Sequence, residues 1–166
     1  MKIAIISDTH DNIPNLEKAL FWINSQKISL IIHCGDLCAP SVLTEILVKK
    51  FPHQIYLIHG NVGDRELLEE KVKNFKNVKL FGDFGEIEID KKKIAFVHKP
   101  EEAKKIAETG KYDLVFYGHT HKPWEEKIGK TRLVNPGNLA GMFYRATFAV
   151  YDTKTDKLEL KILENL

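Results

Sequence analysis

The stretch Ile-Ala-Ile-Ile-Ser-Asp-Thr-His at residues 3–10 is an apolar run that ends in a carboxylate and an imidazole two positions apart. In an extended chain, residues i and i+2 point to the same face, so Asp8 and His10 could both bind one metal ion. Taken alone, the pair has a simpler interpretation, in which Asp8 caps the next helix and His10 lies in the turn. The metal interpretation depends on whether the pattern recurs.

The pattern recurs four times along the chain. Mostly apolar runs at 30–33, 55–59, 94–97 and 114–117 end at Gly35-Asp36, Gly60-Asn61, His98 and Gly118-His119-Thr120-His121. Because ligands in open α/β sheets collect outside the carboxyl ends of the strands, these residues are expected to converge. The predicted metal centre contains seven side chains: Asp8, His10, Asp36, Asn61, His98, His119 and His121.

Seven oxygen and nitrogen ligands are too many for one ion and suit two divalent ions that share a carboxylate. Carboxylate and imidazole without thiolate indicate Mn²⁺, Ni²⁺, Fe or Zn²⁺ rather than Ca²⁺ or an iron–sulfur cluster. We favour Mn²⁺, although the residues themselves do not select among these metals. Without metal, seven such groups gathered at one sheet edge would leave several charges uncompensated, which is costly.

Size and charge narrow the possible partners. The 166 residues fit a single domain spanning 1–166. With 25 Lys and Arg against 23 Asp and Glu, the net charge of +2 is too balanced to favour a membrane or a stable nucleic-acid complex. We expect no signal peptide, no spanning helix and a cytoplasmic location. The only two cysteines, Cys34 and Cys38, are expected to be reduced thiols.

The hydrophobic pattern predicts an α/β fold. Helices at 12–26, 40–50 and 65–75 alternate with strands at 3–6, 29–33 and 55–58, which indicates a largely parallel sheet. Shorter strands at 78–81, 84–89 and 94–97 resemble an antiparallel meander. After one helix at 101–108, strands at 124–128, 133–135, 147–151 and 158–162 are expected to complete a second sheet. The two sheets should pack face to face with helices outside.

The order Asp-x-His, Gly-Asp, Gly-Asn, His, Gly-His-x-His resembles the calcineurin-like metallophosphoesterase superfamily, over residues 1 to about 152. The length and the Asn135-Pro136-Gly137 turn are similar to those of its small single-domain phosphodiesterases from bacteria and archaea. The resemblance implies a four-layer αββα sandwich. It also implies a metal-dependent phosphodiesterase that acts on small or nucleotide-like phosphodiesters, and more weakly on monoesters. In it, Asp8, His10 and His121 would bind one ion, Asn61, His98 and His119 the other, and Asp36 would bridge them.

In two places the chain departs from the family pattern. Many members carry a His after the Gly-Asn pair to protonate the leaving oxygen, but here Val62 and Gly63 follow, so turnover should depend on the leaving group's own acidity. The shifted turn leaves the role of Asp64 open. Lys99 replaces the usual Gly after His98 and could bind a substrate phosphate or point to water.

Other polar residues have structural interpretations that compete with functional ones. His33 and His59 are expected to have structural roles or to support the ligands from behind. Asn12 should cap the first long helix. Arg65 and Arg145 could bind phosphate, although a surface ion pair is the simpler role for each.

A non-catalytic scaffold, similar to the retromer scaffold subunit of eukaryotes, is the alternative function. The complete ligand set favours the enzyme. A homodimer or tetramer is compatible with the sequence, because the apolar segment Met142-Phe143-Tyr144 could form an interface or a lid. Trp124 could line a cleft or close a strand edge.

Overall fold

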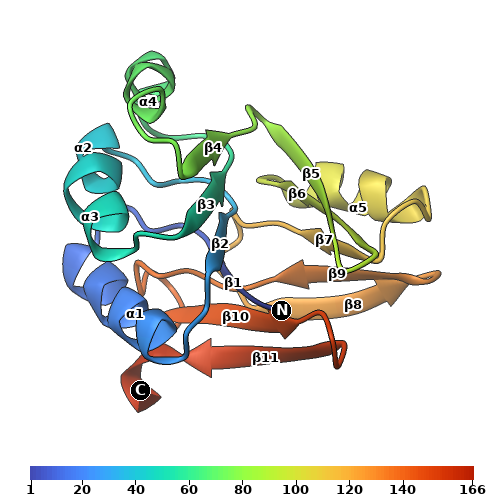
Figure 1. The fold of residues 1–166 in the computed structure, drawn as a ribbon. Coiled ribbons are helices and arrows are strands. Elements are labelled where there is room, and N and C mark those ends of the chain that lie inside the picture. Colours follow the sequence, from blue (N-terminus) through green and yellow to red (C-terminus); the bar gives the residue numbers. More distant parts are fainter.

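The computed structural model describes residues 1–166, whose strands form two sheets (Figure 1). The six-stranded sheet contains four parallel strands, in the order β1 (Lys2–Ile6), β2 (Leu30–His33), β3 (Gln54–Leu57) and β4 (Val78–Leu80). On the other side of β1, β10 (Thr147–Asp152) pairs antiparallel with β1, and β11 (Lys157–Ile162) pairs antiparallel with β10. The second sheet has the order β5 (Phe84–Ile89), β6 (Lys92–Val97), β7 (Leu114–Phe116), β9 (Thr131–Asn135) and β8 (Trp124–Ile128). Its central strands β6, β7 and β9 are parallel, and both edge strands are antiparallel to their neighbours.

Helices cover the outer face of each sheet, which gives four layers (Figure 1). The helices are α1 (Ile13–Ser25), α2 (Pro40–Val42), the π-helical turn η1 (Leu43–Leu47), α3 (Val48–Lys50), α4 (Arg65–Val72), α5 (Pro100–Glu108) and the 3₁₀ turn η2 (Leu163–Asn165). Helix α1 begins where expected, because the Asn12 side chain accepts a hydrogen bond from the Asn15 backbone N–H at 3.1 Å and Pro14 occupies the first turn. The two sheets and the helices on their outer faces confirm the predicted four-layer αββα sandwich.

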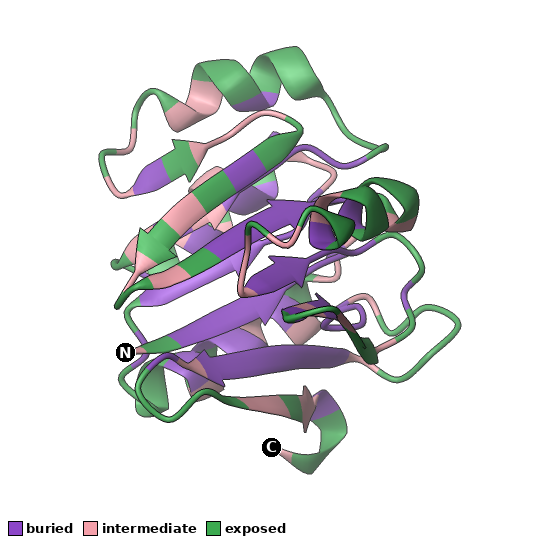
Figure 2. Cartoon of the chain, turned by 90° about the vertical axis from the view of Figure 1, so that its right-hand side faces the viewer, coloured by how far each residue is buried: buried purple, intermediate pink, exposed green.

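Strand alternation divides the apolar side chains between the layers. In β1, Ile3 and Ile5 pack between the two sheets, whereas Ala4 and Ile6 pack against the helices of the first sheet. Figure 2 shows the central strands buried along most of their length, with mixed exposure on the helices and edge strands. The metal-ligand candidates follow these buried strands, so a rigid core fixes the points from which their loops start.

Three strands pair differently from what the sequence indicated. Strand β4 pairs in parallel with β3, not in a meander, because the turn at Gly82, with a φ of 78°, carries the chain from the first sheet to the second. Strands β10 and β11 belong to the first sheet, since β10 pairs with the open edge of β1, matching Ile3 with Tyr151. Local periodicity identifies a strand but not its partner. No helix has both the length and the apolar surface to cross a membrane.

Candidate metal centre

The seven candidate ligands lie at one rim of the sandwich, in loops that follow five strands. Asp8 and His10 follow β1, Asp36 follows β2, and Asn61 follows β3 in the first sheet. The second sheet contributes His98 after β6, and His119 and His121 after β7. Because β1, β2 and β3 are parallel, as are β6 and β7, the loops within each sheet leave from the same edge.

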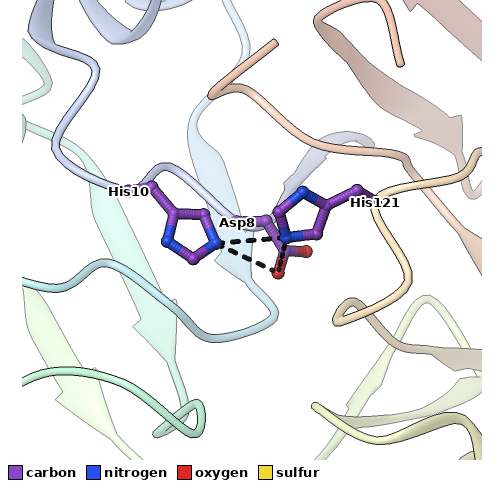
Figure 3. Close-up of side chains that lie close together, drawn as sticks. All are labelled: Asp8, His10 and His121. Carbon is purple, nitrogen blue, oxygen red and sulfur yellow. Dashed lines mark hydrogen bonds and ion pairs between the residues drawn. The ribbon is translucent and has the colours of Figure 1, made fainter. Parts of the chain in front are cut away.

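Asp8, His10 and His121 form the first group of donor atoms (Figure 3). The Nε2 atoms of His10 and His121 lie 3.1 Å apart, and Asp8 Oδ1 lies 3.9 Å and 3.4 Å from them. Donor atoms that share one ion at about 2.1 Å stand roughly 3–4 Å from each other. The spacing of this group therefore fits one divalent ion.

The second group of donor atoms is centred on Asn61. Its Oδ1 atom lies 2.8 Å from His98 Nε2 and 2.8 Å from His119 Nδ1. Asp36 stands between the two groups, because its Oδ2 atom is 3.3 Å from His98 Nε2 and 3.6 Å from His10 Nε2. Asp8, Asp36 and His98 also have donor atoms within 4.8 Å of one another. The arrangement has the form of two triads joined by one carboxylate.

The ligand loops depend on unusual backbone conformations. Asp8, His10, Asp36, His119 and His121 all have a left-handed φ, between 42° and 67°. Asp and His tolerate this region better than most residues, but each instance costs of order 1–3 kcal/mol. Asp8 and His10 thus converge through a tight turn, and not through the strand alternation that the sequence suggested.

Two glycines allow the loops to approach closely. A Cβ atom on Gly118 would lie 2.6 Å from Asp8 Oδ2, and one on Gly60 would overlap the Asp36 side chain. Each glycine precedes a candidate ligand in sequence, Asn61 or His119. The Gly-Asn and Gly-His pairs therefore have a steric reason, since any side chain before the ligand would displace a carboxylate from the other half of the site.

Burial and nearby charges shift the acidity of the ligands. Burial raises the pKa of Asp8 to about 6, against the lowering effect of the hydrogen bond from the Ser7 hydroxyl at 2.6 Å. Burial also raises the pKa of Asp36, but the hydrogen bond and charge of His98 outweigh it, and the net pKa is below the usual value. A divalent cation would compensate both carboxylates, so the site fits divalent metal.

Neighbouring groups orient the candidate ligands, and most of these groups were not evident from the sequence. His98 Nδ1 donates to the Cys34 carbonyl oxygen at 2.8 Å, which leaves its Nε2 lone pair free for a metal. Asn135 donates to the Gly118 carbonyl at 2.8 Å, and the buried Asn138 donates to the His121 carbonyl at 3.0 Å. Asparagines that follow a ligand loop are the one sequence signal that could have indicated these supports.

Two histidines outside the predicted ligand set have side-chain partners within the fold. His33 is fully buried against Thr9, at 2.6 Å, and His59 pairs with Glu69 at 3.0 Å. Neither imidazole belongs to the two donor groups. Cys34 and Cys38 are free thiols, as expected.

Arg65 does not present a free guanidinium to the site. It pairs with Asp83 at 2.8 Å and donates to the Gly60 carbonyl at 3.0 Å, so it holds the loop that carries Asn61. Arg145 forms a surface ion pair with Glu164 at 2.9 Å, which was the simpler prediction.

The structure places the three remaining positions, Asp64, Trp124 and Lys99. Asp64 caps α4, because its carboxylate accepts from the Leu67 N–H at 2.9 Å. Trp124 lies on β8, the edge strand of the second sheet, and is half exposed. Lys99 is exposed directly after His98, at the start of α5.

The chain is similar to a known protein family and to curated relatives. Residues 1–156 match the family model described as the calcineurin-like phosphoesterase superfamily domain. A phosphodiesterase of Methanocaldococcus jannaschii is 33% identical over 168 residues, covering 99% of this chain and 100% of the relative. The Escherichia coli phosphodiesterase YfcE is 23% identical over 156 residues, covering 84% of this chain and 80% of the relative.

Solved structures give the same relationship. A structure of a novel archaeal phosphodiesterase superposes with a TM-score of 0.89 at 30% identity, covering 98% of this chain and 99% of that one. A zinc complex of Vps29 from Entamoeba histolytica has a TM-score of 0.72 at 18% identity, and the match covers 96% of this chain and 90% of that one. At this identity the likeness concerns the fold alone. The motif order, the fold and the matched family model agree, and the chain belongs to the calcineurin-like phosphoesterase superfamily.

Proposed function

We propose that the protein is a metal-dependent phosphodiesterase that hydrolyses small or nucleotide-like phosphodiesters, and monoesters more weakly. The observation that carries the proposal is the pair of donor triads joined by Asp36, which lies between His98 and His10 at 3.3 Å and 3.6 Å. The names of the phosphodiesterase relatives support the same activity.

In this proposal, Asp8, His10 and His121 hold one divalent ion, and Asn61, His98 and His119 hold the second. Such a pair of ions supplies a water of lowered pKa and positive charge beside the phosphoryl oxygens. The residues of the chain fix the geometry. Asp36 is only 3% exposed and is held by the Val62 backbone N–H at 3.1 Å, so its carboxylate cannot turn away from the imidazoles.

The chain offers no acid at the position after Asn61. Val62 is 42% exposed and carries no proton to give to the leaving oxygen. In hydrolysis, water attacks phosphorus and the P–O bond to the leaving alcohol or phenol breaks. The leaving oxygen then receives no proton from residue 62. We expect the rate to rise steeply with the acidity of the leaving alcohol or phenol.

Lys99 is proposed as a binding residue for the substrate phosphate. Lys99 is exposed and follows His98 directly, and its side chain makes no capping hydrogen bond at the start of α5. A lysine acts on a phosphoryl oxygen as a mobile point charge. Arg65 is not proposed for this task, because Asp83 and the Gly60 carbonyl already engage its guanidinium.

The test is hydrolysis of bis(p-nitrophenyl) phosphate by protein reconstituted separately with Mn²⁺, Ni²⁺, Fe²⁺ and Zn²⁺. We expect activity with Mn²⁺ to be highest and metal analysis to give two ions per chain. Lack of turnover with every metal, in protein that binds two ions, would reject the phosphodiesterase. The scaffold alternative would then gain weight, since it shares the fold but needs no complete ligand set.

A further inference from the structure

The segment that follows the last strand of the second sheet is tied to the ligands of the first triad. The Ala140 backbone N–H donates to the Asp8 carbonyl oxygen at 3.0 Å. The buried Asn138 side chain links the two loops, since it donates to the His121 carbonyl and accepts from the Met142 N–H, each at 3.0 Å. The position of residues 140–142 is therefore fixed relative to Asp8 and His121.

This anchored segment ends in an exposed aromatic ring beside the site. Phe143 is 87% exposed, the largest exposed fraction among the large apolar side chains that are exposed. Its ring centroid lies 5.7 Å from that of His121, with 50° between the ring planes. Met142 and Tyr144, on either side, are 43% and 45% exposed. The apolar surface is thus continuous with a candidate metal ligand.

The backbone at Phe143 is strained. Its φ is 64°, and the Tyr144 N–H donates to the Met142 carbonyl at 2.7 Å, which describes a tight turn over three residues. A bulky residue at a left-handed φ is uncommon, and such outliers cluster at ligand sites. A glycine would make the same turn without strain, so the phenyl ring is the feature that the turn presents.

We propose that Phe143 forms the wall of a subsite that binds a planar aromatic ring carried by the phosphate ester, such as an aryl group or a nucleobase. This inference rests on the proposed function and names its substrate class. A phosphoryl group bound beside His121 would bring the ring of its ester arm within reach of Phe143. Stacking on a phenyl face is tolerant of ring identity, because every base or aryl group offers a π-face.

The test compares the binding of benzylphosphonate and methylphosphonate to the Mn²⁺-loaded protein by titration calorimetry. Both ligands carry the same charged group and resist hydrolysis, and they differ by one phenyl ring. The wild type is expected to bind benzylphosphonate roughly 5- to 150-fold more tightly, the range that aromatic stacking supplies. Phe143→Ala should reduce this preference to less than about 2-fold, and Phe143→Tyr should keep it.

Phe21→Ala is the matched control, because Phe21 is 79% exposed on α1, beside Asn24 and Lys50, which are not part of the candidate site. It should bind both phosphonates as the wild type does. Metal content and sedimentation are measured for every variant. The subsite is rejected if Phe143→Ala retains its metal and the wild-type preference. It is equally rejected if that variant changes only from oligomer to monomer, because the segment is then an interface between copies.

Binding and turnover separate the two proposals. A protein that binds benzylphosphonate through Phe143 but leaves bis(p-nitrophenyl) phosphate intact would sustain the subsite and reject the phosphodiesterase. A protein that hydrolyses the diester, with the same benzyl preference before and after Phe143→Ala, would sustain the activity and reject the subsite.

Discussion

Replacing Gly60 by alanine should disturb the centre without removing a single proposed ligand. The added Cβ would lie 2.7 Å from the Asp36 Cγ and closer still to the Asp36 backbone nitrogen, which cannot rotate away. Overpacking of this kind costs about 1–3 kcal/mol. Displacing the carboxylate also breaks its 3.1 Å hydrogen bond from the Val62 N–H, a charged hydrogen bond worth about 1.5–3 kcal/mol.

Together these terms predict that Gly60→Ala lowers the free energy of unfolding by roughly 2.5–6 kcal/mol, and the Tm by roughly 5–24 °C for a chain of this size. The second effect concerns metal. Because Asp36 is proposed to serve both ions, stabilisation by Mn²⁺ should also fall, from about 2.7 kcal/mol per ion at a concentration 100 times Kd towards zero.

The assay is thermal unfolding of wild type and variant with chelator and with excess Mn²⁺. Gly110→Ala is the control, because Gly110 has a left-handed φ of 64° but no atom within 4 Å of an added Cβ. It should cost only about 1–2 kcal/mol and leave the Mn²⁺ response intact. The reasoning about Asp36 would be refuted if the Tm of Gly60→Ala lay within about 2 °C of the wild-type Tm. It would also be refuted if Mn²⁺ raised the Tm of the variant as much as it raises that of the wild type.

Three further predictions concern single side chains. Asn61→Ala should lose one of two bound ions and at least about 100-fold in turnover, whereas the exposed His53→Ala should match the wild type in both metal analysis and kinetics. Burial lowers the pKa of His33 from 6.5 to about 3, so its contribution to stability, up to about 5 kcal/mol, is present above pH 6.5 and lost as the pH falls towards 3. Denaturant unfolding between pH 7 and 4 should show that His33→Gln loses less free energy of unfolding on acidification than the wild type does. An equal loss in the two proteins would contradict this. Lys99→Ala should raise KM several-fold with kcat nearly kept, while Lys104→Ala on the same helix changes neither, and equal behaviour of the two variants would remove Lys99 from substrate binding.

The sequence was most informative where a residue type has one dominant physical role. Helix α1 begins directly after Asn12, because the Asn12 side chain accepts a hydrogen bond from a free backbone N–H of the first turn, and that preference is visible without a structure. The strand ends were predicted because an apolar run that stops at Gly-Asp or Gly-His has few alternatives. The pairing of β4 with β3 and that of β10 with β1 were not predicted. The partner of a strand depends on which sheet edges remain open after the helices have packed.

The geometry of the site was the part that the sequence could not give. Alternation along a strand suggested that Asp8 and His10 share a face, but both residues have a left-handed φ, of 50° and 42°, and they converge through a turn after β1 has ended. Likewise, no pattern indicated that the Asn138 side chain joins the His121 loop to Met142. Contacts of this kind depend on backbone conformations that a residue string does not encode locally.

The strained backbone links the stability of the fold to the proposed metals. Five of the seven candidate ligands have a left-handed φ, and at about 1–3 kcal/mol each their combined cost is comparable with the whole stability of an ordinary domain. The buried Asp8 carboxylate adds to it, since burial raises its pKa to about 6. Such an arrangement persists only if the packed sheets on either side hold it, or if bound cations offset it. The rim should therefore be the first region to open when metal is removed, and hydrogen exchange at the His119–His121 loop should rise with chelator while exchange in β1 and β2 stays slow.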